Sequence, residues 1–459
     1  MKNTKRLLII NHDFPPAGGA GIKRCLKFMK FLPEYGWQLT VLTVRDGNHP
    51  IIDHSLLQEV GPDVTVHRAF TFESLFNKGV ERNKDRNEAI DIHRERHNSL
   101  RSRLTGIYDT YGHLFKIPDS RILWMPAAVT AAFKLVLKKQ FDVIYATGPT
   151  FVNFIIAALV KVLSRKPLII DFRDAWLADP MIFDNEKKYL IKIHRILEKF
   201  VIHQADKVVS TNLFVTRDFR ERYRSQDSDK FLTIYNGYDI DDFAFMNEYK
   251  HRHNDIFTVV YTGRLYDERT PKYFLEALKL ALEENPEMRD TTRAIFVGSC
   301  EEFLDRRHIE DYLEEYNLKD VVQLTGHISR RESLEYQMSA SVLLLLIGIV
   351  PPEMEMTYGL SGKVFDYLLS KKPILTLANG GSTREFIVEN KIGEIFFHEE
   401  VQKIRNYLIE AYTKFTNGIP AERYDVAAYE KFDFRSLSKT LSEQMESIVN
   451  NNKGQYGKE

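Results

Sequence analysis

Short apolar runs alternate with amphipathic segments along the first half of the chain. Apolar runs bounded by turn residues are typical of buried strands in a parallel sheet, and apolar residues three and four apart are typical of helices. The predicted strands are Leu7–Ile10, Leu39–Val44, Val143–Tyr145, Leu168–Ile170 and Lys207–Ser210, and the predicted helices are Ile22–Leu32, Ala127–Lys138, Phe151–Leu163 and Tyr189–Ala205. This alternation predicts a doubly wound parallel sheet.

A second series of the same kind follows a turn-rich joint at Asn236-Gly237. Its predicted strands are Phe257–Thr262, Ala294–Val297, Val321–Leu324, Val342–Leu346, Ile374–Ala378 and Glu394–Phe397, and its predicted helices include Lys272–Glu284, Ile309–Tyr316 and Arg331–Ser339. Two successive units of this kind predict an α/β protein with two Rossmann-like domains facing across a cleft, where ligands bind outside the carboxyl ends of the strands.

The predicted domains are residues 1–215, on the acceptor side, and residues 216–430. The amphipathic stretch within 431–459 predicts a C-terminal helix that packs back on the first domain, followed by a disordered tail over Asn451–Glu459. Residues 77–103 are highly charged and poor in apolar residues, which predicts an insertion at the edge of the first sheet.

Length and composition agree with two globular domains, since 459 residues exceed what one core usually holds. The two cysteines, Cys25 and Cys300, match no metal-ligand spacing and predict a reducing compartment. The longest apolar run, Phe154–Val160, is stopped by Lys161 and is too short to span a bilayer. We therefore expect a cytoplasmic protein, or one bound peripherally to the inner face of the membrane.

The formal net charge of zero conceals an asymmetry between the two halves. Residues 1–220 hold 34 Lys and Arg against 23 Asp and Glu, and the remainder holds 30 against 41. A basic first half suits anionic lipid headgroups or a phosphate-bearing acceptor, and an uneven solvated surface is the simpler alternative. Nucleic acid is disfavoured, because no helix-turn-helix or basic–aromatic pattern accompanies the charge.

The stretch Gly359–Ala378 predicts a glycine-containing loop, a short helix and a buried strand. Ser361, Gly362, Lys363 and Val364 fall at the predicted helix start, where free N–H groups suit a diphosphate. Asp366 follows within the first turn, where a carboxylate can accept hydrogen bonds from a ribose diol. An ordinary αβ unit without a ligand would have the same pattern.

Two further glycine-containing loops follow predicted strands. Gly18 and Gly19 come after the first strand and permit close backbone approach to a ligand, which makes them candidate donor-binding residues. Their spacing is not the dinucleotide fingerprint, so nicotinamide binding is not expected. Gly263 ends the first strand of the second series and is followed by the basic residues Arg264, Arg269 and Lys272. These cations can stabilise a leaving diphosphate, or they can form a solvated basic loop.

A dense polar cluster, Asp171-Phe-Arg-Asp-Ala-Trp176, follows the buried strand that ends at Ile170. Charged residues at the end of a parallel strand are commonly part of a site, which makes Arg173 and Asp174 candidate catalytic residues. An ion pair internal to the domain is the competing interpretation.

Seven motifs in order resemble the family 4 glycosyltransferases, which have the GT-B fold and use nucleotide sugars. They span almost the whole chain: Phe14-Pro-Pro-x-x-Gly-Gly19, Asp142-Val-Ile-Tyr-Ala-Thr-Gly148, Asp171-Phe-Arg-Asp174, Asn236-Gly-Tyr-Asp239, Thr262-Gly-Arg264, Gly326-His-Ile328 and Gly362-Lys-Val-Phe-Asp-Tyr367. The segment Pro118–Pro126 also resembles members that act in bacterial surface-polysaccharide assembly. The resemblance implies that His327 and Ile328 lie on the donor side.

The resemblance also implies that Arg264 binds the diphosphate. The partner lysine of the family would fall at Thr270, so either Arg269 or Lys272 must take its place. Of the two glutamates that the family has seven residues apart, the second corresponds to Asp366. The first would fall at Tyr358, so the usual carboxylate contact to the donor sugar is missing or comes from Glu353 or Glu355.

By the same resemblance we expect transfer from a UDP- or GDP-sugar to a glycan or lipid-linked acceptor, with retention of configuration. No metal or other cofactor is expected, because basic residues neutralise the diphosphate and the Asp-x-Asp pattern at Asp239 and Asp241 belongs to a turn motif. Two alternatives stay open: a nucleotide-sugar 2-epimerase of the same architecture, and a non-catalytic nucleotide-sugar-binding subunit. The altered position Tyr358 favours the latter, and the retained Arg264, Gly362 and Asp366 oppose it.

Overall fold

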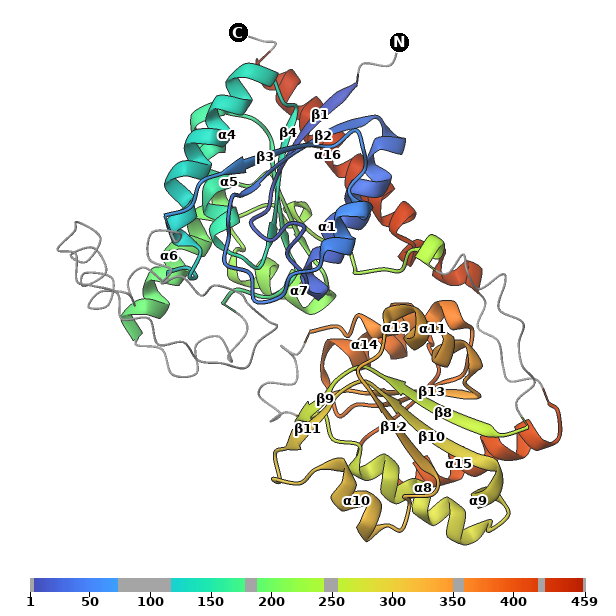
Figure 1. Ribbon diagram of the computed structural model, residues 1–459. Helices are drawn as coiled ribbons and strands as arrows, with labels where there is room; N and C mark the ends of the chain where they lie inside the picture. The colour runs from blue at the N-terminus through green and yellow to red at the C-terminus, as the bar shows by residue number, and fades with distance from the viewer. Residues whose placement is uncertain are drawn as a thin grey trace. The chain divides into compact units, whose positions relative to one another are not determined.

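The computed structural model describes residues 4–72, 117–177, 188–242, 255–349, 359–419 and 426–456. The chain forms two compact units (Figure 1). The first comprises residues 1–211, 215–234 and 438–459, and the second comprises residues 212–214 and 235–437. The predicted insertion at 77–103 lies outside the described residues.

The described part of the first unit is built on a seven-stranded parallel sheet in the order β3-β2-β1-β4-β5-β6-β7. Its strands are β1 (Lys5–Ile10), β2 (Trp37–Val44), β3 (Thr65–Ala69), β4 (Val143–Gly148), β5 (Leu168–Phe172), β6 (Lys207–Ser210) and β7 (Phe231–Thr233). The central strands β4 and β5 are buried along their whole length, as their near-continuous apolar runs predict.

Helices cover both faces of this sheet. They are α1 (Ala20–Phe31), α4 (Met125–Lys139), α5 (Val152–Ser164), α6 (Lys188–Gln204), α7 (Leu213–Arg222) and α16 (Phe434–Tyr456). In Figure 1, α4 and α5 lie on one side of the sheet and α1 and α16 on the other. Helix α5 is apolar on nearly all sides and buried along most of its length, because α4, α6 and the sheet all contact it.

The C-terminal helix α16 packs on the first unit through the apolar side chains of Leu441, Met445, Ile448 and Val449. Its polar contacts join segments from opposite ends of the chain, since Trp37 donates to the Ser442 hydroxyl over 2.8 Å. The helix continues to Tyr456. The prediction of a disordered tail from Asn451 onward is therefore wrong for residues 451–456, where the helix simply continues.

The described part of the second unit has a six-stranded parallel sheet in the order β12-β10-β8-β13-β14-β15. Its strands are β8 (Phe257–Thr262), β10 (Thr292–Val297), β12 (Val322–Gly326), β13 (Val342–Leu346), β14 (Ile374–Leu377) and β15 (Glu394–Phe396). Two short strands, β9 (Leu265–Asp267) and β11 (Cys300–Phe303), pair beside it. The predicted two-sheet α/β architecture is confirmed.

Seven helices of the described second unit form two layers around this sheet. One apolar core lies under α8 (Lys272–Glu284), α9 (Met288–Thr291), α10 (Ile309–Glu315) and α15 (Val401–Thr416). The other lies under α11 (Arg330–Ser339), α13 (Lys363–Ser370) and α14 (Gly381–Asn390). Among the described residues of both units, every helix is too short or too polar to traverse a lipid bilayer.

Candidate functional site

The strand order of the second sheet reverses between β8 and β13, because the chain adds β10 and β12 on one side of β8 before it adds β13 on the other. Ligands of doubly wound folds bind at such a reversal, beyond the carboxyl ends of the strands. Two glycines leave this position free of side-chain atoms of their own. Gly263 follows β8 with φ +119° and Gly298 follows β10 with φ +132°, and a Cβ on Gly298 would lie 2.4 Å from the carbonyl oxygen of Gly263.

Lys363, the first residue of α13, reaches into this cleared space. Its ammonium donates to the Tyr261 hydroxyl over 2.6 Å and lies 4.2 Å from the centre of that ring. A methyl group on Gly263 would come within 2.4 Å of Nζ, so the glycine leaves room for the lysine. Burial, and then the neighbouring guanidinium of Arg269, hold the pKa of Lys363 well below its usual range.

Arg269 and Arg264 lie around Tyr266, with their guanidinium carbons 5.2 and 5.0 Å from the centre of its ring. Burial raises the pKa of Tyr261 well above its usual value, and the charge of Arg269 together with a hydrogen bond from it offsets part of that rise. Arg264 is more than half exposed and forms an ion pair of 2.5 Å with Glu301 on β11. Two cations, Arg269 and Lys363, therefore meet at Tyr261, and Arg264 lies beside them.

Lys272 lies apart from this group. It is the first residue of α8, where its backbone N–H donates to the Thr270 hydroxyl over 3.2 Å. Its ammonium lies 5.6 Å from the centre of the Tyr273 ring. Of the two candidates for the second cation, Arg269 is thus the one that interacts with Tyr261 and Lys363.

Helix α13 begins where the sequence predicts, with Gly362 as the residue before its first turn. The preceding loop is held by Thr383, whose hydroxyl accepts from the Ser361 N–H over 3.0 Å. Gly362 is exposed, and Val364 is buried in the core beneath. Lys363 is itself the first residue of this helix, so one residue brings a cationic side chain to a helix N-terminus, which is an end that favours anions.

Asp366 is bound by an arginine that the sequence motifs did not single out. Arg330, the first residue of α11, donates to both carboxylate oxygens over 3.2 Å and lies 3.6 Å from Asp242. His327 and Ile328 precede this helix, after β12. His327 is exposed, and Ile328 packs partly against the core.

In the first unit, glycine is needed at positions 18 and 19 for two different reasons. A Cβ on Gly18 would lie 2.7 Å from the Ile51 side chain, so the neighbouring loop packs directly on the backbone. Gly19 has φ +114°, a conformation that favours glycine, and it immediately precedes α1.

The polar cluster Asp171–Trp176 begins within β5, which extends two residues beyond the predicted strand end, and its side chains have two different roles. Asp171 is fully buried and accepts two hydrogen bonds of 2.9 Å from Arg24, together with one from the Tyr145 hydroxyl. This is the internal ion pair that the sequence left as an alternative. Arg173 donates to the carbonyl oxygens of Gly148 and Pro149, and the Asp174 side chain is exposed.

A second Asp-x-Asp sequence lies at Asp227–Asp229, and both it and the one at Asp239–Asp241 begin turns. Asp239 accepts the Asp241 N–H over 3.0 Å, and Asp227 accepts the Asp229 N–H over 3.0 Å. In each pair, the carboxylate of the first aspartate therefore stabilises the turn in which it lies. Tyr358, Glu353 and Glu355 lie outside the described residues.

The sequence motifs did not identify three residues of the second-unit site: Tyr261, Glu301 and Arg330. Tyr261 is an inward-facing residue of a buried strand, and nothing in its local pattern distinguishes it from a core tyrosine. Glu301 and Arg330 come from segments 37 and 36 residues away from their partners. Only the strand order brings these pairs together.

Two sequence families match the chain, one over each sheet. The model of Glycosyltransferase Family 4 matches residues 23–242, and that of Glycosyl transferases group 1 matches residues 244–416. No curated protein matches the sequence.

Several solved structures share the fold over nearly the whole chain. Anabaena HepE in complex with UDP and glucose has a TM-score of 0.56 at 16% identity, and the match covers 96% of this chain and 100% of that one. The α,α-trehalose 6-phosphate synthase of Burkholderia multivorans has a TM-score of 0.60 at 11% identity, with 99% and 98% covered. Sucrose-phosphate synthase of Thermosynechococcus elongatus has a TM-score of 0.51 at 15% identity, with 99% and 98% covered.

The two family matches follow one another from residue 23 to residue 416, and they cover β2 to β7 of the first sheet and all six strands of the second. The structural neighbours repeat this pair of sheets over full-length chains. On these grounds the chain belongs to the family 4-type glycosyltransferases of GT-B fold.

Proposed function

We propose that this glycosyltransferase transfers a sugar from UDP to a hydroxyl of a glycan or lipid-linked acceptor, with retention of configuration and without a metal ion. The observation that carries the proposal is the meeting of Lys363, Arg269 and Tyr261 at the strand-order reversal, in the space left by Gly263. The lowered pKa of Lys363 reflects an ammonium that is both desolvated and close to a second cation. A bound diphosphate relieves both unfavourable effects.

The proposed chemistry follows from these positions. The first N–H groups of α13, Lys363 and Arg269 hold the diphosphate, and Arg264 exchanges Glu301 for a phosphate oxygen as the bond to the sugar breaks. The departing diphosphate oxygen takes the proton of the acceptor hydroxyl, which attacks from the same face. Asp366 accepts hydrogen bonds from the ribose, and His327 and Ile328 border the base.

UDP is proposed as the carrier because HepE, a neighbour of the same fold, binds UDP and glucose. The acceptor side is assigned to the first unit. In that unit, Gly18 and Gly19 are proposed as donor-binding residues, and Arg173 and Asp174 as catalytic residues. The basic balance of residues 1–220 suits an acceptor attached to an anionic membrane surface. These assignments rest on charge and on family resemblance.

Calorimetric binding of UDP tests the central observation. The pKa of free Lys363 is lowered, and a bound diphosphate raises it, so binding takes up a proton at pH values between the two pKa values. We expect UDP affinity to fall as the pH rises through that window, and the binding enthalpy to depend on the ionisation enthalpy of the buffer. Lys363→Met should abolish this dependence, and Lys272→Met should preserve it.

Transfer itself is tested with UDP-sugars in the presence of EDTA. Activity that is lost in chelator and restored by Mn²⁺ or Mg²⁺ would contradict the metal-free mechanism. UDP release with formation of a 2-epimer and no acceptor consumed would instead indicate an epimerase. A failure to bind either UDP or GDP would remove the proposed donor site.

A further inference from the structure

The strand order of the first sheet also reverses beside its first strand, and polar residues gather there. The chain adds β2 and β3 on one side of β1 and then β4 on the other, so the reversal lies between β1 and β4. His12 and Asp13 follow β1, while Thr150 and Asn153 follow β4. His49 follows β2. Sequence motifs singled out none of these residues, and the donor site does not use them.

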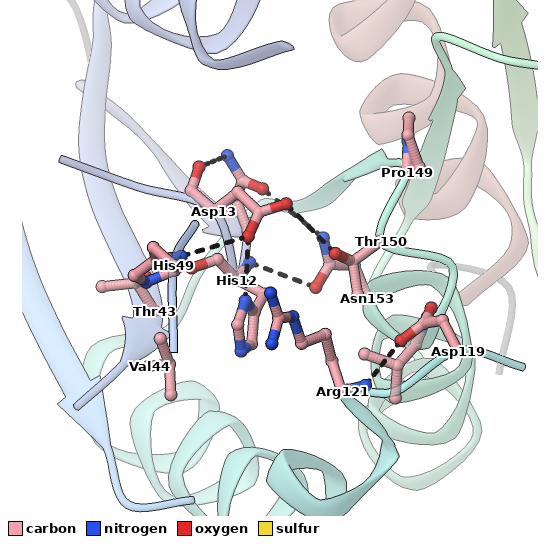
Figure 2. A network of polar contacts seen from close by, with 12 residues as sticks. His12, Asp13, Thr43, Val44, His49, Asp119, Arg121, Pro149, Thr150 and Asn153 are labelled. Carbon is pink, nitrogen blue, oxygen red and sulfur yellow. Dashed lines mark hydrogen bonds and ion pairs between the residues drawn. The ribbon is translucent and has the colours of Figure 1, made fainter. Parts of the chain in front are cut away.

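Figure 2 shows how three of these side chains converge on the Asp13 carboxylate. His12 Nδ1 lies 3.0 Å and His49 Nδ1 lies 3.6 Å from Oδ1, and the Thr150 hydroxyl donates to Oδ2 over 3.1 Å. The position of His12 is fixed from its backbone as well, because its N–H donates to Asn153 Oδ1 over 3.1 Å. The carboxylate is therefore held by residues from three separate strand ends.

Asp13 is more exposed than the two histidines, which indicates that its carboxylate is available to a ligand. The His12 side chain is fully buried and that of His49 is 10% exposed, whereas the Asp13 side chain is 30% exposed. Burial raises the pKa of Asp13, but the hydrogen bond with His12 and the neighbouring His49 ring outweigh burial and hold the pKa far below its usual range. Burial lowers the pKa of His12, so its ring is neutral and donates from Nδ1. The imidazoles support an ionised carboxylate that faces outward.

Such a carboxylate accepts strong hydrogen bonds from hydroxyl groups and repels phosphate or carboxylate groups. We propose that Asp13, supported by His12, His49 and Thr150, binds hydroxyl groups of an uncharged sugar residue of the acceptor. This proposal rests on the proposed function and makes it narrower. If the acceptor is anionic, its charged part must lie elsewhere, and the residue bound at β1 and β4 is a neutral glycoside.

One possible metal-ligand atom from each of His12, Asp13 and His49 lies within 4.8 Å of the others. This spacing is also compatible with a bound metal ion. The guanidinium of Arg121 argues against that occupant. It is close enough to lower the pKa of both His12 and Asp13 electrostatically, so a second cation would be repelled. The neutral sugar is therefore the favoured ligand.

The test uses the full chain saturated with UDP and a set of methyl glycosides, with saturation-transfer NMR as the readout. We expect at least one of the neutral methyl glycosides of glucose, galactose, mannose and N-acetylglucosamine to bind, and methyl glucuronide not to bind. Asp13→Asn should weaken the neutral glycoside by about tenfold or more, since a charge-assisted hydrogen bond is lost. Asp63→Asn, at an exposed aspartate of the same unit, should bind as the wild type does.

Thr150→Val provides a second variant in case Asp13→Asn does not fold. It removes one hydrogen bond from the carboxylate and should weaken the glycoside by about threefold. The proposal is overturned if no neutral glycoside binds, if the glucuronide binds equally well, or if Asp13→Asn binds like the wild type. Stoichiometric Zn²⁺ binding that is lost in His49→Ala would overturn it as well. UDP binding, measured in the same samples, reports separately on the proposed function.

Discussion

In both sheets the strand order reverses beside the first strand, between β1 and β4 in one and between β8 and β13 in the other. The carboxyl ends at these two positions differ in charge. At the first sheet, acids are surrounded by donors: Asp171 by Arg24 and Tyr145, and Asp13 by two histidines. At the second sheet, the cationic side chains of Lys363 and Arg269 interact with Tyr261.

Under the two proposals, one scaffold serves two kinds of ligand through a few side chains at the strand ends. A diphosphate needs excess positive charge, and hydroxyl groups need a positioned acceptor. The contrast also predicts different effects of mutation: loss of stability in the first unit and loss of activity in the second. Breaking the buried pair in the first unit should destabilise that unit, and removing a cation from the second should stop turnover while the fold persists.

The largest expected effect is on stability, from Arg24→Met. Arg24 is 3% exposed and Asp171 fully buried, so the substitution leaves a buried carboxylate without its cation. We expect the free energy of unfolding of the first unit to fall by about 3–5 kcal/mol. All three tryptophans, Trp37, Trp124 and Trp176, are buried in this unit, so urea unfolding followed by tryptophan fluorescence reports on it selectively.

The double variant Arg24→Met/Asp171→Asn is the control for this prediction. Removal of the carboxylate charge should restore a large part of the lost stability, while UDP affinity stays within about twofold of wild type throughout. A single variant with an unchanged urea midpoint would show that the ion pair does not stabilise the unit.

Arg264→Ala should have the largest effect on activity. Loss of one cation that meets developing diphosphate charge typically costs about 3–4 kcal/mol at the transition state, or 10²–10³ in rate. The tryptophan-detected midpoint should not move, because Arg264 is exposed in the other unit. The matched control is Arg289→Ala, which removes another surface ion pair, with Asp320. Retention of more than about a third of wild-type turnover would contradict the assigned role of Arg264.

Gly263→Ala should affect stability and donor binding together. At φ +119° an alanine is strained by about 1–3 kcal/mol, and its Cβ would also displace Lys363 from Tyr261. Circular dichroism should show earlier unfolding of the second unit, and calorimetry should show weaker UDP binding. Gly418→Ala is the control, since its φ is +63° and no atom lies within 4 Å of the added Cβ. Equal effects from the two substitutions would mean that backbone strain alone explains the loss.

Asp366→Asn should have the smallest effect. A carboxylate in the first turn favours a helix by about 0.3–1 kcal/mol, and UDP binding should weaken by more than this amount with little change in the ligand-free melting temperature. Wild type should bind 2′,3′-dideoxyuridine diphosphate poorly. If Asp366→Asn discriminates against that analogue as strongly as wild type does, Asp366 does not bind the ribose. Arg330→Ala separates the effect of the ion pair from that of the ribose.

Sequence patterns predicted the central strands and most helices because these are buried and strongly periodic. Strand β8 and helix α13 illustrate this, with the predicted strand Phe257–Thr262 and the predicted helix start at Gly362 both observed. The edge strands β3 and β7, the short strands β9 and β11, and the helices α7, α9, α14 and α15 were not predicted. Thr65–Ala69 is largely half-buried and alternates weakly, so its apolar signal is faint.

By itself the sequence determined the features that depend on neighbouring residues: the alternation of strands and helices, the glycines at strand ends and the turn at Asp239. The tertiary structure alone decided which charged residues meet. Asp171 pairs with Arg24 across 147 residues, and Asp13 gathers partners from three strand ends. The physical reason is that periodicity records the burial of each element, whereas charge pairing depends on strand order, which brings distant loops to one edge of a sheet.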